Sequence, residues 1–343
     1  MIGISLLTLN VAAGGGTLTY VRELVRSLAH VGELEYRTLV PPGSADAGGG
    51  LPSVVVRAPF SGRGRAAALA GAAFGAVRVD GLAGVHFPVG VMLPRVDSVP
   101  AATTLHDLQH EEFPQFFSWS QRAYRRRVYG WTIERSRMLI AISEYVRRSL
   151  IERHSVAPDR VRTIHHGIDH AVFSPGTATR EPFLLYPANA WPHKNHGRLF
   201  EAFALVRRRR PELRLVLTGA GHDRLRLPEG VVSHGRVRVE ELVELYRTAA
   251  AVVFPALYEG FGLPPLEAMA CGCPVAVSRV ASLPEVCGEA AIYFDPTSAE
   301  SVAEGIETVL DRPPAGGIAH AASFTWEECA RRHDAVYREL EAG

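Results

Sequence analysis

The sequence predicts an α/β protein made of two domains, each a doubly wound parallel sheet with helices on both faces. Apolar strand-like runs alternate with helical runs in both halves of the chain, a pattern typical of parallel sheets that are covered on both sides. Residues 176–182 interrupt this alternation with a linker that contains Gly and Pro. A length of 343 residues suits two domains. We expect them at residues 1–175 and 176–324.

The first domain is expected to begin with a buried strand at residues 2–9, followed by the glycines Gly14–Gly16 and a helix from about Thr17. The apolar positions of this helix share one face: Leu18, Val21, Leu24, Val25 and Leu28. Further strands are expected at 36–40, 53–57, 85–88, 102–105, 138–143 and 161–165. The Ala- and Gly-rich segment 66–77 fits either a helix or a mobile segment.

The second domain repeats the same alternation after the linker. Its strands are expected at 183–187, 213–218, 231–234, 251–254, 274–278 and 291–294. Its helices are expected near 196–209, 239–249, 264–271 and 299–311, and one more follows at 325–341.

Composition excludes several classes of protein. The chain is 47% hydrophobic and 21% charged with a net charge of +1, which is ordinary for a globular protein and gives no general case for a nucleic-acid partner. It has no apolar run of transmembrane length and no signal-peptide pattern, so we expect a cytoplasmic protein. Its four cysteines form no Cys-x-x-Cys pair, and no His or Cys cluster completes a metal site.

The most informative stretch runs from Pro255 to Pro274. An apolar strand leads into Gly260 and Gly262, and the prolines Pro264 and Pro265 suit the start of a helix. A strand, a Gly-bearing turn and a helix N-terminus together bind anions, because uncovered amides and the helix dipole converge there.

Two glutamates bracket that turn. Glu259 precedes it, and Glu267 is expected in the first turn of the helix. An anion site flanked by two carboxylates that accept from hydroxyls fits a phosphorylated sugar. A simpler interpretation is that Glu267 complements the helix dipole and that Glu259 is a solvated loop residue.

The segment Glu-Gly-Phe-Gly-Leu-Pro-Pro-Leu-Glu-Ala-Met-Ala-Cys-Gly-Cys-Pro-Val, residues 259–275, resembles the E-x7-E signature of the retaining glycosyltransferases of family 4. This resemblance implies the GT-B fold, in which two Rossmann-like domains face an interdomain cleft and the last helix, here 325–343, crosses back to the first domain. It also implies metal-independent transfer of a hexosyl group from a nucleoside-diphosphate sugar to a hydroxyl of a glycan or small natural product, without a further cofactor. The sequence leaves the base open among UDP, GDP, dTDP and ADP.

Lys194 is the only lysine of the chain, and an ammonium is a good point-charge partner for phosphate. Family members often carry Gly-Arg-x-x-x-x-Lys at this place, and by that resemblance Lys194 neutralises the diphosphate. The arginine position is occupied here by Asn189, which removes one cation. His193, Arg198 or the amides of Gly14, Gly15 and Gly16 are candidates to compensate.

His106 follows an expected strand of the first domain, at the end where open α/β sheets place their ligand crevices. A lone histidine is often structural. The resemblance implies that His106 contacts the donor sugar and helps to orient the anomeric carbon, whereas Asp107 is expected to orient the loop.

The remaining donor-site residues come from the same resemblance. Gly219 is expected to allow close approach of the nucleotide, and Gly235, Arg236 and Val237 resemble the segment that reads the base. The turn amides are expected to meet the diphosphate, at Gly260, Phe261, Gly262 and Leu263. Glu259 is expected to bind hydroxyls of the transferred sugar and Glu267 those of the ribose.

Residues 122–131 mix arginines with aromatic side chains. A solvated helix face is the simpler interpretation, and the alternative is weak peripheral contact with an anionic membrane or with the acceptor. Two other functions stay open beside transfer. One is a GT-B epimerase that acts on a nucleotide sugar, and the other is a catalytically silent protein that binds one.

Overall fold

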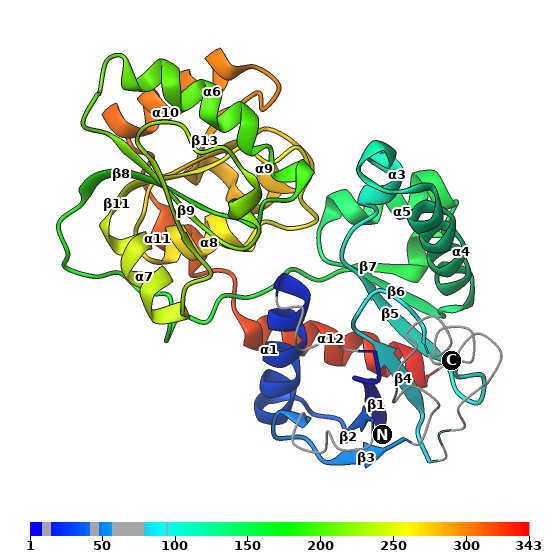
Figure 1. Ribbon diagram of the computed structural model, residues 1–343. Coiled ribbons are helices and arrows are strands. Elements are labelled where there is room, and N and C mark those ends of the chain that lie inside the picture. The colour runs from blue at the N-terminus through cyan, green and yellow to red at the C-terminus, as the bar shows by residue number, and fades with distance from the viewer. Residues whose placement is uncertain (9–14, 42–47, 57–78, 80, 94, 343) are drawn as a thin grey trace. The chain divides into compact units, whose positions relative to one another are not determined.

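The computed structural model describes residues 1–343 except 9–14, 42–47, 57–78, 80, 94 and 343. Gly14 and the segment 66–77 therefore lie outside the described residues. The chain divides into two compact units, labelled by their elements in Figure 1. Unit 1 comprises Met1–Gly167 and Trp326–Gly343, and unit 2 comprises Ile168–Thr325.

Unit 1 contains a seven-stranded parallel sheet with the order β3-β2-β1-β4-β5-β6-β7. The chain runs from β1 outward to β3 and then returns to place β4 on the other side of β1. The strands are β1 (Ile2–Ser5), β2 (Tyr36–Val40), β3 (Ser53–Val55), β4 (Gly84–Phe87), β5 (Ala101–Leu105), β6 (Met138–Ala141) and β7 (Val161–Thr163).

Helices cover both faces of this sheet, so β1, β4, β5 and β6 are buried along their whole length. The helices are α1 (Gly16–Val31), α3 (Gln109–Glu112), α4 (Trp119–Arg135), α5 (Glu144–His154) and α12 (Trp326–Glu341), with 3-10 turns η3 (Pro114–Phe116) and η4 (Pro158–Arg160). On one face α1 and α12 pack against each other and share a core with β1. The five apolar residues predicted on the inner face of α1 are all buried there.

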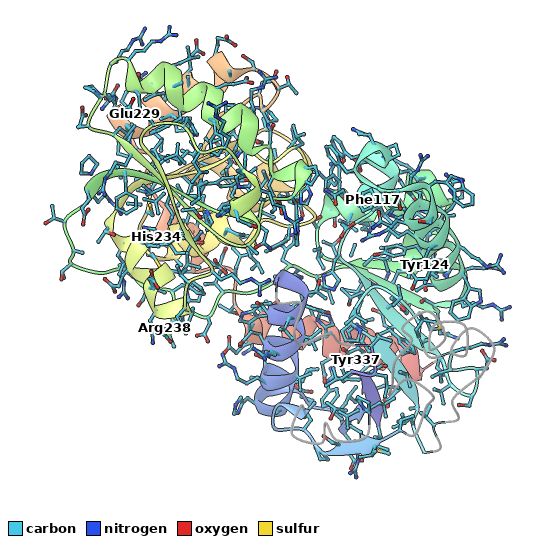
Figure 2. All side chains as sticks on the ribbon, in the orientation of Figure 1. Phe117, Tyr124, Glu229, His234, Arg238 and Tyr337 are labelled. Carbon is cyan, nitrogen blue, oxygen red and sulfur yellow. The ribbon has the colours of Figure 1, made fainter. Side chains whose placement is uncertain are left out.

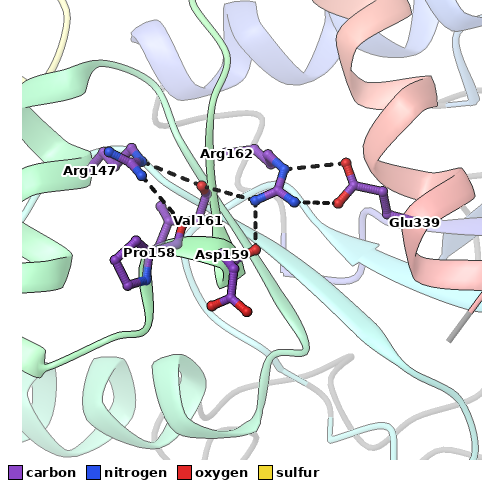
Figure 3. A network of polar contacts seen from close by, with 6 residues as sticks. All are labelled: Arg147, Pro158, Asp159, Val161, Arg162 and Glu339. Carbon is purple, nitrogen blue, oxygen red and sulfur yellow. Dashed lines mark hydrogen bonds and ion pairs between the residues drawn. The ribbon is translucent and has the colours of Figure 1, made fainter.

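Polar contacts also tie α12 to unit 1. Arg162 of β7 forms a two-pronged ion pair with Glu339, with Nε–Oε1 at 3.3 Å and Nη2–Oε2 at 2.6 Å, and donates to the carbonyl of Asp159 (Figure 3). Ahead of β1 the amino group of Met1 lies 3.0 Å from Glu341. The last helix is therefore an integral part of unit 1.

Unit 2 contains a six-stranded parallel sheet with the order β10-β9-β8-β11-β12-β13. Its strands are β8 (Glu181–Pro187), β9 (Arg214–Thr218), β10 (Val231–Gly235), β11 (Ala249–Phe254), β12 (Val275–Ser278) and β13 (Ile292–Phe294). Its helices are α6 (His196–Arg207), α7 (Val239–Thr248), α8 (Leu263–Ala270), α9 (Leu283–Cys287), α10 (Ala299–Asp311) and α11 (Gly317–Ala321), with 3-10 turns η5 (Pro192–Lys194), η6 (His222–Arg224) and η7 (Gly288–Ala290).

The division between the units falls after Gly167, eight residues before the boundary expected at 175. The intervening segment packs on unit 2: Arg247 donates from Nε to the carbonyl oxygen of Ser174 at 2.9 Å, and Phe173 lies against Tyr246. Composition marks a linker at 176–182. The units separate earlier in the chain, where the side chains stop packing on unit 1 and begin to pack on unit 2.

Several strands are shorter than predicted. The strand expected at 2–9 ends at Ser5, although Leu6 and Leu7 beyond it are also buried. The strands expected at 53–57 and 138–143 end at Val55 and Ala141 in the same way. An apolar run in the sequence indicates which residues are buried. Residues stay buried beyond the last backbone pairing of the strand, so the predicted strands are too long. No helix in the described part of the chain is both long and apolar enough to cross a bilayer.

Candidate functional site

Two loops of unit 2 leave the sheet at the point where its strand order reverses. β8 and β11 are neighbours there, and both run parallel. The loop after β8 carries Asn189 and Lys194, and the loop after β11 carries Glu259. Doubly wound sheets bind ligands at the carboxyl ends of the two strands that flank such a switch point.

Lys194 and Glu259 meet across these two loops. The ammonium Nζ and the carboxylate Oε1 form an ion pair, and the side chains are only 11% and 14% exposed. Nζ also lies 5.0 Å from the ring centroid of Phe254, within the range of a cation–π contact. The structure therefore brings together two of the residues that the sequence placed in the donor site.

The loop after β11 is tied to the loop after β8. Leu257 donates its backbone N–H to the carbonyl oxygen of His193 at 2.8 Å. Asn195 donates from Nδ2 to the carbonyl oxygens of Pro255 and Pro296, at 3.1 and 2.9 Å. Its backbone is left-handed, with φ of 59°, a conformation that asparagine tolerates better than most residues. Sequence reasoning did not single out Asn195.

A second anchor comes from α9. Ser282 donates from Oγ to the carbonyl oxygens of Glu259 and Phe261, at 2.8 and 2.7 Å. The segment around Gly260 and Phe261 is thereby fixed before any ligand arrives. Such preorganisation is what a site for developing negative charge requires.

Helix α8 begins directly after this loop, as the two prolines predicted. Gly262 is its N-cap with φ of 118° and no side chain caps it, so the N–H of Leu263 opens the helix ahead of Pro264 and Pro265. No acidic residue lies in the first turn. The helix N-terminus therefore keeps its partial positive charge for a ligand.

Glu267 is not in the first turn, as expected from the sequence, but is the fifth residue of α8. The helix begins at Leu263, so the dipole interpretation of Glu267 loses most of its force. The residue is half-buried, and its carboxylate accepts from the hydroxyl of Tyr246, with Oη–Oε2 at 2.9 Å. Burial raises the pKa of Glu267 to about 7.

Asn189 connects the loop after β8 to the loop after β9. Its Oδ1 accepts from the backbone N–H of Ala220 at 2.7 Å. Gly219 has φ of 134°, and a Cβ there would lie 2.7 Å from the carbonyl carbon of Ala188. Glycine is thus required because two backbones approach closely. This spatial reason differs from the nucleotide contact for which the sequence singled out Gly219.

Gly235 ends β10 beside this contact. Its carbonyl accepts from the N–H of Gly219 at 2.7 Å, and a Cβ at Gly235 would meet open space. His222 links Ser233 to the carbonyl oxygen of Ala188, with Nδ1–Oγ at 2.8 Å and Nε2–O at 2.9 Å. His222 escaped sequence analysis because no motif marks it.

Arg236 and Val237 follow β10. Arg236 is exposed to solvent, and Val237 is half-buried. Neither lies in the loops that hold Lys194 and Glu259, so their expected role at the base stays a prediction.

Two residues offered as compensation for Asn189 are poorly suited to it. Burial and the neighbouring ammonium of Lys194 lower the pKa of His193 to about 3, so its imidazole is neutral at pH 7. Arg198 is paired with Glu201, with Nη1–Oε2 at 2.5 Å. Of the cations in this part of unit 2, Lys194 thus stays the one predicted at the diphosphate.

Unit 1 carries the other predicted residues. Gly15 is the N-cap of α1 with φ of 94°, and Gly16 is the first helical residue; no side chain caps the helix and no acidic residue lies in its first turn. These features match an anion-binding helix start. β1, which precedes this loop, lies beside β4 at the switch point of the sheet.

His106 follows β5, and its Nε2 lies 2.7 Å from the carbonyl oxygen of Pro88, which follows β4. A carbonyl only accepts, so Nε2 carries the hydrogen. Burial lowers the pKa of His106, which keeps the ring neutral and leaves Nδ1 as an acceptor. Asp107 accepts from the N–H of Gln109 at 3.0 Å, consistent with its expected role in orienting the loop.

A buried polar chain lies behind His106, and sequence reasoning missed it. Tyr20 packs edge-on against the His106 ring with centroids 5.1 Å apart. The hydroxyl of Tyr20 lies 2.8 Å from both Thr104 Oγ1 and His333 Nε2. His86 connects Thr104 to Tyr337 (Figure 2) at 2.8 and 2.7 Å. Sequence separations of 18 to 313 residues between partners hid this cluster.

Helix α4 carries the basic run. Trp119 is 80% exposed and Tyr124 is 42% exposed (Figure 2), and Arg126 and Arg127 also face solvent. Trp131 instead packs against the core beside β4. Among the residues that the structure describes, no group of three or more His, Cys, Asp or Glu side chains is arranged to hold a metal ion.

Comparisons with known proteins identify the family of the chain. The model for Glycosyltransferase Family 4 matches residues 14–172, and the model for Glycosyl transferases group 1 matches residues 168–322. O-antigen chain mannosyltransferase B of Escherichia coli is 30% identical over 268 residues, 70% of each chain. A D-inositol 3-phosphate glycosyltransferase of Saccharomonospora viridis is 31% identical over 282 residues, 71% of this chain and 65% of the relative.

Solved structures share the fold over nearly the whole chain. Sucrose-phosphate synthase from Thermosynechococcus elongatus aligns with a TM-score of 0.76 and 21% identity, covering 99% of both chains. The Anabaena protein HepE, solved in complex with UDP and glucose, aligns with a TM-score of 0.74 and 16% identity over 99% of both chains. Two doubly wound parallel-sheet units with this topology make up the GT-B fold.

The protein belongs to glycosyltransferase family 4 and is a glycosyltransferase enzyme. The boundary between the two family matches, near residue 170, lies close to the division between the units after Gly167.

Proposed function

We propose that this glycosyltransferase transfers a hexosyl group from a nucleoside-diphosphate sugar to a hydroxyl of a glycan or of a small natural product. We infer retention at the anomeric carbon from the resemblance of residues 259–275 to the family signature. The observation that carries the proposal is the ion pair of Lys194 and Glu259 at the switch point of unit 2.

Lys194 and the N-terminus of α8 are assigned to the diphosphate. As the anomeric C–O bond breaks, negative charge collects on the β-phosphate, and a fixed ammonium and a helix N-terminus stabilise it. Lys194 is held by Glu259 before the donor arrives and can share its hydrogens with phosphate oxygens afterwards. These groups supply the positive charge that a metal ion supplies elsewhere, so the reaction is proposed to proceed without one.

The carboxylates are assigned to the two sugars. Glu259 accepts hydrogen bonds from hydroxyls of the transferred hexose, and Glu267 accepts from the ribose. Gly219, Gly235, Arg236 and Val237 line the side on which the nucleoside is placed. The carbonyl of Gly235 is held by the N–H of Gly219, which keeps this edge in one conformation.

Unit 1 is assigned the anomeric end of the donor and the acceptor. His106 is neutral, so it acts through hydrogen bonding at Nδ1 and not as a cation. The start of α1 at Gly15 and Gly16 offers further N–H groups to the phosphates. The leaving phosphate takes the proton of the acceptor hydroxyl in the mechanism that the family resemblance implies, and no separate general base is assigned.

The comparisons support the choice of substrates. Two relatives are named for transfer to an O-antigen chain and to D-inositol 3-phosphate, both rich in hydroxyls. HepE, a fold neighbour, was solved with UDP-glucose. We therefore place UDP sugars first among the donors to be tried.

We also propose a cytoplasmic location, and a weak peripheral contact between α4 and an anionic membrane. Arg126 and Arg127 supply the charge, and Trp119 supplies an exposed aromatic ring. Sedimentation with vesicles containing about 30% anionic lipid tests the contact. Replacement of both arginines by Gln should release the protein, and unchanged binding contradicts the assignment.

A thermal-shift screen with UDP, GDP, dTDP and ADP tests the donor class. A ligand at about 100 times its dissociation constant adds roughly 2.7 kcal/mol to the free energy of unfolding, so one base should stand out. NMR analysis of the product, with the matching sugar donor and an acceptor panel, then tests transfer and retention. A β-linked product from an α-linked donor contradicts retention.

Two outcomes would favour other functions. Interconversion of the free nucleotide sugar in the absence of any acceptor indicates an epimerase. Tight donor binding with no turnover across the panel indicates a silent binding protein, for which the missing arginine at Asn189 is the motivating observation.

A further inference from the structure

Tyr246 lies behind the carboxylate that is assigned to the ribose. It belongs to α7, its side chain is fully buried, and its hydroxyl donates to Glu267 Oε2 at 2.9 Å. The ring of Phe173 packs against it with centroids 6.2 Å apart. The hydroxyl is therefore held in one place, and within the described part of the chain it is the one hydrogen-bond donor to this side chain.

The surroundings of Glu267 contain little else that favours a charged carboxylate. Burial raises its pKa to about 7, and the hydrogen bond from Tyr246 opposes that shift. The thiols of Cys271 and Cys273 are the other titratable groups that act on this pair; burial raises the pKa of both to about 12, so both are neutral. Burial also raises the pKa of Tyr246, which keeps its hydroxyl protonated and donating.

We propose that Tyr246 is a positioning residue for the donor: its hydroxyl anchors one carboxylate oxygen of Glu267 and turns the side chain so that the second oxygen accepts from the ribose diol. The proposal rests on the assigned role of Glu267 in the proposed function. A carboxylate offers two oxygens with about four acceptor positions. With Oε2 anchored by Tyr246, Oε1 is the oxygen that faces the ligand.

Replacing Tyr246 by Phe removes this hydroxyl and keeps the ring. The charged form of Glu267 then loses its one donor, and its pKa rises further. At neutral pH more of the side chain carries a proton, and a protonated carboxyl group is a poorer acceptor for two hydroxyls. The effect is a pH-dependent loss of nucleotide affinity, which a general loss of structure does not produce.

The experiment is calorimetric titration between pH 6 and pH 9. The probes are UDP, GDP and ADP, of which the tightest is used, and its 2′,3′-dideoxy form. Both probes share the titration of the phosphate, so the ratio of their dissociation constants isolates the diol. Tyr293→Phe is the matched control, since it removes a hydroxyl that donates to the carbonyl oxygen of Gly288, away from Glu267.

In the wild type the dissociation constant of the dideoxy probe, divided by that of the full nucleotide, should fall toward one as the pH falls through about 7. In Tyr246→Phe the midpoint should move up by about one pH unit, which makes the dissociation constant at pH 7 roughly five times larger and leaves it nearly unchanged at pH 9. Tyr293→Phe should follow the wild type. In Glu267→Gln the ratio should be independent of pH, and adding Tyr246→Phe should change it no further.

An unshifted midpoint in Tyr246→Phe overturns the proposal, as does an equal loss of affinity for the dideoxy probe. Exclusive binding of dTDP, which lacks the diol, also overturns it. If the wild type binds none of the nucleotides, the proposed function itself fails. If it binds one and turns over its sugar donor while the midpoint stays fixed, only the role of Tyr246 fails.

Discussion

Lys194 shows how a single residue type can be selected by its surroundings. Lys194 is the only lysine in the sequence, whereas the other 36 of the 37 Lys and Arg residues are arginines. At this position the ammonium is 11% exposed, contacts Glu259 and lies over the ring of Phe254. A compact point charge fits between a carboxylate and an aromatic face, whereas a planar guanidinium requires a wider, forked arrangement.

Lys194→Ala should lower kcat/KM for the nucleotide-sugar donor at least about 100-fold, because the charge that meets the leaving phosphate is removed. Lys194→Arg should recover only a small part of this loss, because the fork does not fit. Steady-state kinetics with the donor identified in the thermal-shift screen measures both effects.

Arg198→Ala is the control, because it removes a cation of the neighbouring helix that is already paired with Glu201. It should change kcat/KM less than about three-fold, as expected for an exposed ion pair. Equal losses in Lys194→Ala and Arg198→Ala mean that the overall charge of the loop matters and not the placement of Lys194.

At the scale of one element, α8 depends on how its first residue is reached. Gly262 adopts φ of 118°, and a Cβ there would lie 2.8 Å from Leu283 Cδ2. The left-handed turn therefore does two things: it aims the loop from Glu259 toward the helix, and it lets α9 pack close by. The pair Pro264–Pro265 then fixes the first helical turn.

Gly262→Ala should lower the free energy of unfolding by about 2–3 kcal/mol, from backbone strain and from the clash with Leu283. Gly316→Ala is matched to it, since Gly316 is the N-cap of α11 with φ of 81° and a Cβ there meets nothing. That variant should lose only about 1 kcal/mol, from strain alone. Chemical denaturation measures both, and equal losses exclude the clash.

This element also shows what sequence can and cannot predict. The glycines and prolines of residues 260–265 have strong local backbone preferences. For this reason the start of α8 was predicted to within one residue. The prediction that Glu267 lies in the first turn of α8 was wrong by one turn, because its place in the helix depends on where the helix begins. Asn195 and Tyr246 were not singled out, since each acts through a partner that is distant in the sequence.

At the scale of the whole molecule, α12 completes unit 1 through a directed chain of hydrogen bonds. The carbonyl of Cys329 only accepts, so His333 donates to it from Nδ1 and accepts at Nε2 from Tyr20. Tyr20 then accepts from Thr104 and Thr104 from His86, whose Nδ1 accepts from Tyr337. Every member has its partner as long as both histidines are neutral.

Acid should therefore destabilise the protein. Burial lowers the pKa of His86 and His333, that of His333 to about 4, whereas an unfolded histidine titrates near 6.5. Between these values the unfolded chain binds more protons, so stability falls as the pH drops from about 6.5 to 4. His333 alone should contribute about 3 kcal/mol to this loss.

Denaturation curves collected from pH 7 to pH 4 measure the slope of stability against pH. His333→Gln keeps an acceptor toward Tyr20 and cannot titrate, so its slope should be clearly smaller than that of the wild type. His30→Gln changes an exposed histidine of α1 and should leave the slope unchanged. A wild-type slope in His333→Gln contradicts the assignment of the buried chain.

The fold as a whole was predictable because apolar strand-like runs alternate with helical runs along both units. Parallel sheets bury their strands on both faces, so many of them appear as apolar runs, such as β6 or β11. The division of the units was misplaced because composition marks the linker at 176–182, whereas residues 168–175 before it already pack on unit 2. The network of Tyr20 and His333 joins positions 313 residues apart, and no local pattern reports it.

Calorimetric titration of a nucleoside diphosphate into the wild type and into Lys194→Ala tests the central claim most directly. We expect one site per chain in the wild type and binding at least about 100-fold weaker in the variant, a difference of about 2.7 kcal/mol. Absence of binding to the wild type, or equal affinity for both proteins, would contradict the assignment of unit 2 as the donor site.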